Sequence, residues 1–205
     1  MRAALQSRER TPDSTRRAIL AAAGHLLASR GEEGLAIREL CARAGVTAPT
    51  VYHHFGDKAA LVERVVNDCF AAFDRALARR KPPADPVAAL AWGFDRYLEY
   101  GLLHPTHYHL MFHGPGARRT PAGLAAYDRL RQMITAIAAA GRLRLPVEDA
   151  TAACWCAVHG ITSLVVAGYV PRDAPAVALV REALLARCTI APRRRSPRPR
   201  GGSPA

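Results

Sequence analysis

Apolar residues recur at intervals of three and four along most of the chain, and this periodicity predicts an all-α protein. The first amphipathic segment begins near Ser14 or Thr15 and stops at a glycine-bounded loop over residues 31–34. Two short helices follow, one ending before Gly45 and one over about residues 48–54. A long helix then runs to a basic, proline-rich stretch. No run of alternating apolar and polar residues predicts a strand.

The proline-rich stretch RRKPPADP separates this first group of helices from a second group. Five further helices are expected, over the segments VAALAWGFDRYLEYGLLH and PTHYHLMFH and over about residues 122–140, 147–170 and 174–188. The chain is therefore expected to form about nine helices. Its predicted divisions are a flexible N-terminus at 1–13, a helical domain at 14–60, a second helical domain at 61–190 and a disordered basic tail at 191–205.

The two short helices are joined by AGVTAP and flanked by longer helices, which predicts a helix-turn-helix. Gly45 allows the tight turn, and Val46 can fill the space between the two helices. In the second short helix, Val51 and Phe55 are four residues apart and can both face the core. That helix is short enough for the major groove of DNA, which is about 12 Å wide. The hydrogen-bonding residues left on or near its exposed face are Thr50, Tyr52, His53 and His54.

The segment GLAIRELCARAGVTAPTVYHHFGDKAALVERVV closely resembles the DNA-binding part of the tetracycline-repressor (TetR) family of bacterial transcription regulators. The resemblance rests on the first helix TRRAILAAAGHLLASRG, the AGV turn, the recognition helix TVYHHF and the DKAAL start of the next helix. It covers about residues 14–66. The later ACWCAVHGITSLVVAGY is similar to the Trp…His-Gly segment of one subgroup's C-terminal domain. With HYHLMF, it extends the resemblance to most of the chain.

This resemblance implies DNA contacts residue by residue. Phosphate would bind at Thr47 and at the amide groups of the recognition helix N-terminus, where the helix dipole favours an anion. Thr50 is the expected base contact, with His53 behind it, and Lys58 would bind phosphate. The complete set of expected DNA-binding residues is Thr15, Arg16, Thr47, Ala48, Pro49, Thr50, Tyr52, His53, His54 and Lys58.

One residue departs from the family pattern. Members usually carry threonine or serine where Ala36 stands, and alanine cannot cap the helix that follows, at a cost of about 1 kcal/mol. An enzyme site at His53 and His54 is disfavoured, because neighbours on a helix diverge by about 100°. Within the predicted helix, no acidic residue lies at helical spacing to orient either histidine. We therefore expect a regulator and not an enzyme.

The net charge of +12 comes from 29 basic and 17 acidic residues and is unevenly distributed. Five arginines lie in the last stretch, APRRRSPRPRGGSPA, and without them the charge would be +7. That stretch lacks apolar periodicity, which predicts a disordered end. Since its charge would attract nucleic acid regardless of sequence, a tail-driven, non-specific nucleic-acid binder is one alternative function.

The sequence does not predict a metal, a cofactor or a membrane partner. His109 and His113 could share one helix face, but no carboxylate or cysteine lies in register with them. The uncharged run from Ala150 to Pro171 has roughly the length of a membrane span, although polar residues interrupt it. A helix buried by its own domain and by a second subunit is the preferred interpretation. The five scattered cysteines and the charged N-terminus fit a cytoplasmic protein.

Most aromatic residues lie after the proline-rich stretch, and the resemblance implies a ligand cavity in this second domain. Any single residue of an aromatic and methionine stripe belongs more often to a core than to a pocket, so a place in the core is the alternative for each residue. The expected wall of the cavity consists of Trp92, Tyr97, Tyr108, Met111, Phe112, Trp155 and His159.

The last two predicted helices carry small residues that allow another helix to approach closely. We expect two copies of this pair to form a four-helix bundle in a homodimer. Two recognition helices would then meet successive major grooves of double-stranded DNA, about 34–36 Å apart. The expected interface residues are Ala153, Ala157, Gly160, Ile161, Leu164, Val165, Val180 and Leu184.

These features together predict a dimeric, ligand-responsive transcription regulator. The expected form is a repressor that an unknown small-molecule effector releases from a near-palindromic operator. The alternative from another class is a small-molecule-binding protein or enzyme on the same scaffold. That alternative predicts no salt-sensitive, specific DNA binding.

Overall fold

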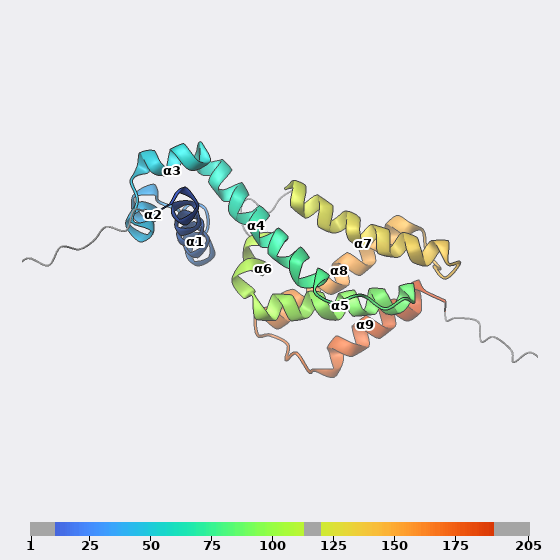
Figure 1. Cartoon of the computed structure of the whole chain (residues 1–205). Helices are drawn as coiled ribbons and strands as arrows, with labels where there is room; N and C mark the ends of the chain where they lie inside the picture. The colour runs from blue at the N-terminus through green and yellow to red at the C-terminus, as the bar shows by residue number, and fades with distance from the viewer. Residues whose placement is uncertain (1–10, 113–119, 191–205) are drawn as a thin grey trace, which may run out of the picture.

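The computed structural model describes residues 11–112 and 120–190, and every regular element within them is an α-helix (Figure 1). The all-α prediction is therefore confirmed. One isolated antiparallel bridge, between Leu143 and Thr189, is the only strand-like pairing in these ranges. The helices are α1 (Pro12–Arg30), α2 (Ile37–Ala44), α3 (Ala48–Phe55), α4 (Lys58–Ala78), α5 (Pro86–Leu103), α6 (Pro105–Phe112), α7 (Pro121–Ala139), α8 (Val147–Val166) and α9 (Pro175–Cys188).

Helices α1, α2 and α3 form one end of the molecule, and α5, α7, α8 and α9 form the other (Figure 1). The small N-terminal unit has a dry core, in which Ile19, Leu26 and Leu40 have no exposed surface. Helix α1 begins two or three residues earlier than predicted, at Pro12. Thr11 caps it by accepting a hydrogen bond from the Ser14 amide at 3.3 Å, and proline suits the first helical turn.

Helix α4 joins the two ends. Asp57 caps its start by accepting from the Ala60 amide at 2.7 Å. The N-terminal half of α4 buries Leu61 and Val65, and its C-terminal half buries Phe70 and Phe73. One cluster of buried residues extends from α1 through α4 and α6 to α8. Because close-packed interiors transmit displacement, a movement of α4 would also move the side chains packed against it in both halves of the molecule.

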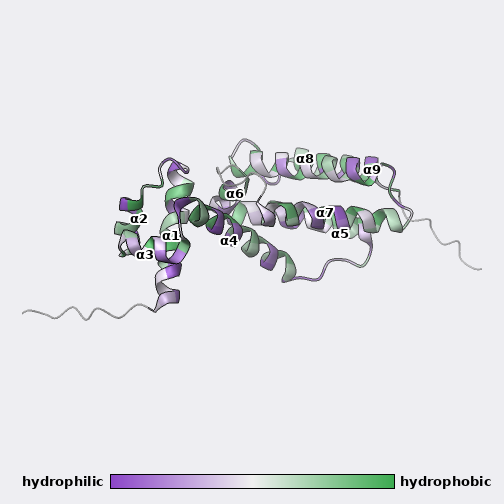
Figure 2. Ribbon diagram, turned by 90° about the horizontal axis from the view of Figure 1, so that it is seen from above, coloured by the Kyte–Doolittle hydropathy of each residue, from purple (hydrophilic) through white to green (hydrophobic). Residues whose placement is uncertain are grey.

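Helix α8 packs against α5, α7 and α9 in the second domain. It ends at Val166, four residues before the predicted end, because Gly168 turns the chain with a φ of 79°. Among the described residues, α8 is the one helix long and apolar enough to cross a membrane. Figure 2 shows apolar and polar positions interspersed on α8 and α9. Helix α8 thus packs on three other helices of its domain and keeps one side exposed.

Helix α6 lies at the junction of the two ends, where it contacts α1, α4 and α5. It buries Tyr108, Leu110 and Met111. The chain leaves α9 near the end of the second domain that is farthest from α3 (Figure 1). There the Arg144 side chain donates to the Thr189 carbonyl at 2.8 Å, which fixes the end of the described chain against the α7–α8 connection.

Candidate DNA-binding surface and ligand cavity

The turn between α2 and α3 positions α3 at the surface. Gly45 adopts a left-handed conformation with φ 63° and ψ 44°, which glycine reaches at little cost. The next amide, of Val46, donates back to the Cys41 carbonyl at 3.1 Å. Ala36, at the start of α2, provides no side-chain cap, as its residue type predicts. The turn is thus closed by backbone hydrogen bonds and by one glycine.

The N-terminus of α3 has a geometry suited to an anion. Thr47 occupies the N-cap position, but its side chain does not accept a hydrogen bond from the helix backbone. Its hydroxyl instead lies 2.9 Å from the hydroxyl of Thr50. Because Thr47 leaves this end of the helix uncapped, the first amide groups of α3 can bind a phosphate.

The faces of α3 divide as the spacing predicts. Val51 is buried at 1% exposure and Phe55 is half-buried. On the opposite side, Tyr52 is 45% exposed and His53 is also exposed. Thr50, His54, Ala48 and Lys58 are half-buried, while Thr47 and Pro49 are exposed. The structure therefore brings eight of the ten predicted DNA-binding residues together, at α3 and the start of α4.

The other two residues come from α1. The Arg16 guanidinium lies 5.7 Å from the centre of the Phe55 ring, a cation–π contact that ties it to the end of α3. Thr15, in contrast, is 9% exposed, and its amide donates to the Thr11 carbonyl at 3.0 Å. Since Thr15 faces the interior of the unit, its predicted contact with DNA is not available on the surface.

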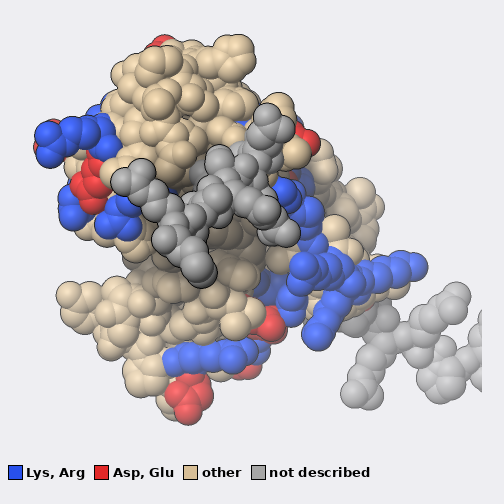
Figure 3. Space-filling view, turned by 60° about the vertical axis from the view of Figure 1, so that its left-hand side comes forward, with Lys and Arg blue, Asp and Glu red and all other residues tan. Residues whose placement is uncertain are grey.

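Bulk charge is modest in this unit. Residues 12–58 contain six basic and five acidic residues. Glu39 pairs with Arg30 at 2.7 Å and with Arg43 at 3.3 Å, so two of the arginines are already engaged. Figure 3 shows Lys and Arg side chains in separate groups with acidic side chains among them. DNA binding by this unit would thus depend on positioned contacts more than on a broad basic surface.

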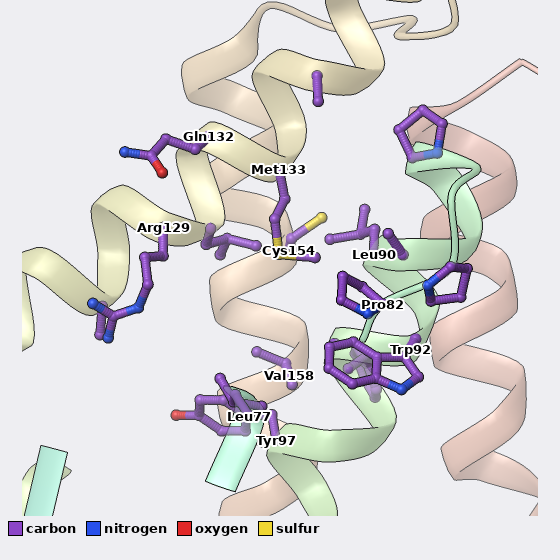
Figure 4. Close-up of a pocket in the computed structure, with 18 of the residues that line it drawn as sticks. Leu77, Pro82, Leu90, Trp92, Tyr97, Arg129, Gln132, Met133, Cys154 and Val158 are labelled. Atoms are coloured by element: carbon purple, nitrogen blue, oxygen red, sulfur yellow. The ribbon is translucent and has the colours of Figure 1, made fainter. Parts of the chain in front are cut away.

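The second domain contains an open cavity of about 900 Å³, lined by residues of α4, α5, α7, α8, α9 and the proline-rich connection. This volume is within the range of small-molecule sites, about 300–1,000 Å³. Figure 4 shows Leu90, Met133 and Cys154 converging on it from three helices. Its lining is mainly apolar and includes Leu77, Pro82, Pro83, Leu90, Trp92, Tyr97, Leu130, Met133, Cys154, Trp155, Val158 and Leu184.

Three of the seven residues predicted for the cavity wall lie there: Trp92, Tyr97 and Trp155. The other four are absent from the lining. Tyr108, Met111 and Phe112 lie on α6, which packs against α1, α4 and α5. His159 lies on α8, where its ring contacts those of Tyr108, Phe112 and Trp155. The Tyr97 and Tyr108 rings lie 6.1 Å apart, and the Trp155 and His159 rings stack at 6.1 Å.

His159 is held by two tyrosines. Its Nδ1 lies 3.0 Å from the Tyr108 hydroxyl and 3.3 Å from that of Tyr97. Burial raises the pKa of both tyrosines, so both hydroxyls stay protonated. These hydrogen bonds give the polar groups of Tyr97, Tyr108 and His159 partners inside the protein, as buried polar groups require.

The charged residues of the cavity were not predicted. Arg129 of α7 forms an ion pair with Asp74 of α4. Burial raises the pKa of Asp74, and the charges of Arg129 and Arg75 oppose that rise. Arg80 also lines the cavity, where the chain leaves α4. Sequence spacing gives no indication of this pair, because its members come from helices far apart in the chain.

The predicted dimer residues fall into two groups. Gly160 is exposed, Leu164 is 47% exposed and Val180 is 40% exposed, as an interface outside the protomer requires. Val165 is 6% exposed and Leu184 lines the cavity, so these two contribute to their own protomer. Ala153, Ala157 and Ile161 are half-buried. Two further apolar residues of this region are more exposed, Leu179 at 67% and Tyr169 at 80%.

Within residues 11–112 and 120–190, no group of three or more metal-binding side chains could hold a metal ion. His113, half of the histidine pair considered above, lies outside the described residues. The cysteines carry free thiols, and burial raises the pKa of the Cys69 and Cys154 thiols to about 12. At neutral pH these two thiols are protonated and behave as small apolar groups.

The fold and the exposed recognition helix define a helix-turn-helix transcription regulator. Two family matches agree with this class. Residues 19–65 match the family described as "Bacterial regulatory proteins, tetR family", and residues 90–187 match "Tetracyclin repressor-like, C-terminal domain". The chain therefore belongs to the TetR family of bacterial transcription regulators. Neither description names the Trp…His-Gly subgroup, which stays a prediction.

Solved structures share this fold over nearly their whole length. A protein of Shewanella sp. PV-4 superposes with a TM-score of 0.72 at 20% identity, over 86% of this chain and 99% of that one. A protein of unknown function from Rhodococcus sp. RHA1 gives 0.70 at 27% identity, over 90% and 100%. A TetR family transcription regulator from Marinobacter aquaeolei VT8 gives 0.64 at 18%, over 86% and 96%. No curated protein matches the chain.

Proposed function

We propose that this protein is a dimeric, ligand-responsive repressor that binds a near-palindromic operator through α3. The observation that carries the proposal is the exposed polar face of α3, with Tyr52 and His53 outward and Val51 inward. Helix-turn-helix proteins place this face in the major groove. The uncapped N-terminus of α3 and Lys58 flank it, so phosphates on either side of the groove could be bound.

The dimer would form through the outer face of α8 and α9. On α8, the exposed residues Ala152, Cys156, Gly160 and Leu164 recur every fourth position and so form one stripe. Small residues at such a stripe allow two helices to approach closely. Leu179 and Val180 of α9 extend the stripe with apolar area. Two α8–α9 pairs would make a four-helix bundle and present two copies of α3 to one side of a DNA duplex.

The ligand response would pass through α4. Asp74 and Phe73 of α4 line the cavity, whereas Leu61 and Val65 of the same helix pack on α1. A ligand in the cavity can therefore shift α4 and change the separation of the two recognition helices. It acts only as far as it binds the two states with different affinity. We place this regulator in the cytoplasm, where the DNA is.

The test is selection of random DNA duplexes by the purified full-length protein at about 0.15 M salt, a physiological ionic strength. We expect enrichment of one near-palindromic sequence whose half-sites lie about one helical turn apart. Binding without enrichment, which disappears as salt rises, would contradict a specific regulator.

A parallel selection with residues 192–205 deleted separates the tail-driven alternative. The chain leaves α9 far from α3, so we expect the truncated protein to enrich the same sequence with some loss of affinity. Complete loss of binding on truncation would favour the non-specific binder. A protein that binds small molecules but no DNA at any salt concentration would favour the carrier or enzyme alternative.

A further inference from the structure

The charged residues that line the cavity are mostly basic. Four charged residues line the cavity, and three of them are basic: Arg80, Lys81 and Arg129, against the single acid Asp74. The side chains of Arg129 and Asp74 are 39% and 40% exposed, so both are accessible from the cavity and from solvent. The rest of the wall is apolar apart from Gln132 and the tyrosine of α5.

A cationic ligand would find no unengaged partner here. Asp74 already faces the charges of Arg129 and Arg75, both of which lower its pKa against the effect of burial. An anionic ligand, in contrast, would find hydrogen-bond donors that are still available. A guanidinium has five N–H donors, so a second carboxylate or a sulfonate can share the Arg129 guanidinium with Asp74 and compete with it for those donors. Arg80 and Lys81, which follow the end of α4, also line the cavity and add to its positive potential.

We propose that the cavity binds an amphipathic organic anion, with a carboxylate or sulfonate on Arg129 and an apolar body among Leu90, Trp92 and Met133. This inference rests on the proposed ligand response and names the chemical class of the effector. An apolar body suits the wall, because its burial against apolar side chains removes apolar surface from water and leaves no polar group without a hydrogen bond. The cavity, at about 900 Å³, accommodates a molecule of two to three fused or linked rings.

The same contact suggests how the effector acts. Arg129 on α7 holds Asp74 on α4, the helix that carries the DNA-binding unit. An anion that draws Arg129 towards itself weakens this connection between α7 and α4. The helix then gains freedom to shift, and operator binding falls. By reciprocity, operator DNA lowers the affinity for the anion by the same factor.

The test compares two probes that share one aromatic body. The first, 1-anilinonaphthalene-8-sulfonate, is an anion, and the second, N-phenyl-1-naphthylamine, is its counterpart without the sulfonate. Both are titrated by fluorescence into the purified full-length protein. We expect the sulfonate to bind at least about tenfold more tightly, as a hydrogen bond to a charged group allows. Equal affinities in the wild type would overturn the anionic class.

Variants then locate the contact. Arg129→Gln should reduce sulfonate binding to the level of the uncharged probe and leave the uncharged probe unchanged. Arg131→Gln is the matched control, because Arg131 lies on the same helix, is about half exposed and does not line the cavity. We expect it to leave both affinities unchanged. An undiminished preference for the sulfonate in Arg129→Gln would overturn the assignment.

If Arg129→Gln does not fold, because Asp74 loses its partner, the double variant Asp74→Asn with Arg129→Gln tests the same point with a neutral pair. It should also show no preference between the probes. Operator binding without any probe is measured in parallel. Its absence would count against the proposed regulator, whereas a missing sulfonate preference with intact operator binding would count against the anionic effector alone.

Discussion

Helices α3 and α6 have nearly the same composition and opposite environments. Each has eight residues, and each contains one proline, one tyrosine, two histidines and a terminal phenylalanine. Helix α3 buries only Val51 and exposes Tyr52, whereas α6 buries Tyr108 together with Leu110 and Met111. A tyrosine in one helix is thus part of a surface, and in the other it is part of a core.

The difference comes from the neighbours of each helix. Helix α3 packs on α2 and α4 and leaves one side open, while α6 is surrounded by α1, α4 and α5. Polar side chains on α3 are therefore free to bind a partner outside the molecule. The polar side chains that α6 turns inward bind partners on neighbouring helices, Tyr100 for His107 and His159 for Tyr108, because a buried polar group without a partner is costly. The comparison predicts that substitutions in α6 affect stability and that substitutions in α3 affect DNA binding.

The largest effect is expected for Met111→Ala in α6. Met111 is 1% exposed, and replacing a fully buried methionine by alanine costs about 2–5 kcal/mol in the free energy of unfolding. Urea denaturation at fixed protein concentration measures this loss. Tyr52→Ala in α3 should change stability by no more than about 0.5 kcal/mol, because the side chain is 45% exposed. Comparable losses in both variants would remove the distinction between the helices.

The second effect concerns DNA. Tyr52→Ala should weaken operator binding by about 1–3 kcal/mol, or roughly 5- to 150-fold, if Tyr52 reaches the groove. The exposed His109 of α6 offers the matched control, and His109→Ala should bind the operator like the wild type. A gel-shift titration with the selected operator measures both. Wild-type affinity in Tyr52→Ala would show that α3 docks in another orientation.

The sequence predicted the helices and the exposed face of α3, because these depend on local features. Gly45 and Gly56 end the two short helices, and the spacing of Val51 and Phe55 orients the second one. The start of α1 was misplaced because Thr11 and Ser14 are both acceptable cap residues. Only the structure shows that the Thr11 side chain accepts the hydrogen bond.

The cavity could be predicted only in part. Aromatic residues were assigned to its wall by composition, but Tyr108 and Phe112 follow α6 to the junction, and sequence does not show which way a helix turns back. Arg129 and Asp74 are 55 residues apart, so nothing local connects them. Val165 was placed at the dimer surface because small and apolar residues surround it. Its burial depends on the rotation of α8 about its own axis.

The third prediction compares the two tyrosines directly. Tyr108→Phe removes a hydroxyl that lies 3.0 Å from His159 Nδ1 and donates to the His159 carbonyl at 3.1 Å. The loss of a buried hydroxyl that leaves partners behind should cost about 1–3 kcal/mol. Tyr52→Phe should cost nothing measurable in stability. Thermal melting of both variants at one protein concentration decides this, and equal melting temperatures would contradict the proposed burial network.

The smallest effect is a pH dependence that arises in α6. His107 Nδ1 lies 2.8 Å from the Tyr100 hydroxyl, which burial keeps protonated and able to donate. Burial, and to a lesser extent His104, lowers the pKa of His107. The folded state therefore disfavours the charged imidazole. As pH falls below about 6.5, the unfolded chain takes up a proton that the folded chain resists, and stability is lost until pH reaches the lowered pKa.

His107→Gln keeps an acceptor at this position but cannot titrate. The wild type should therefore lose more stability than the variant between about pH 7.5 and pH 5, with the difference confined to the interval below the unfolded pKa of histidine, about 6.5. Urea denaturation at half-unit pH steps measures the two slopes. Parallel slopes would mean that His107 takes up its proton as readily in the folded protein as in the unfolded chain. The Tyr100 hydroxyl would then have to donate elsewhere, and the Cys69 carbonyl, at 3.4 Å, is the acceptor within reach.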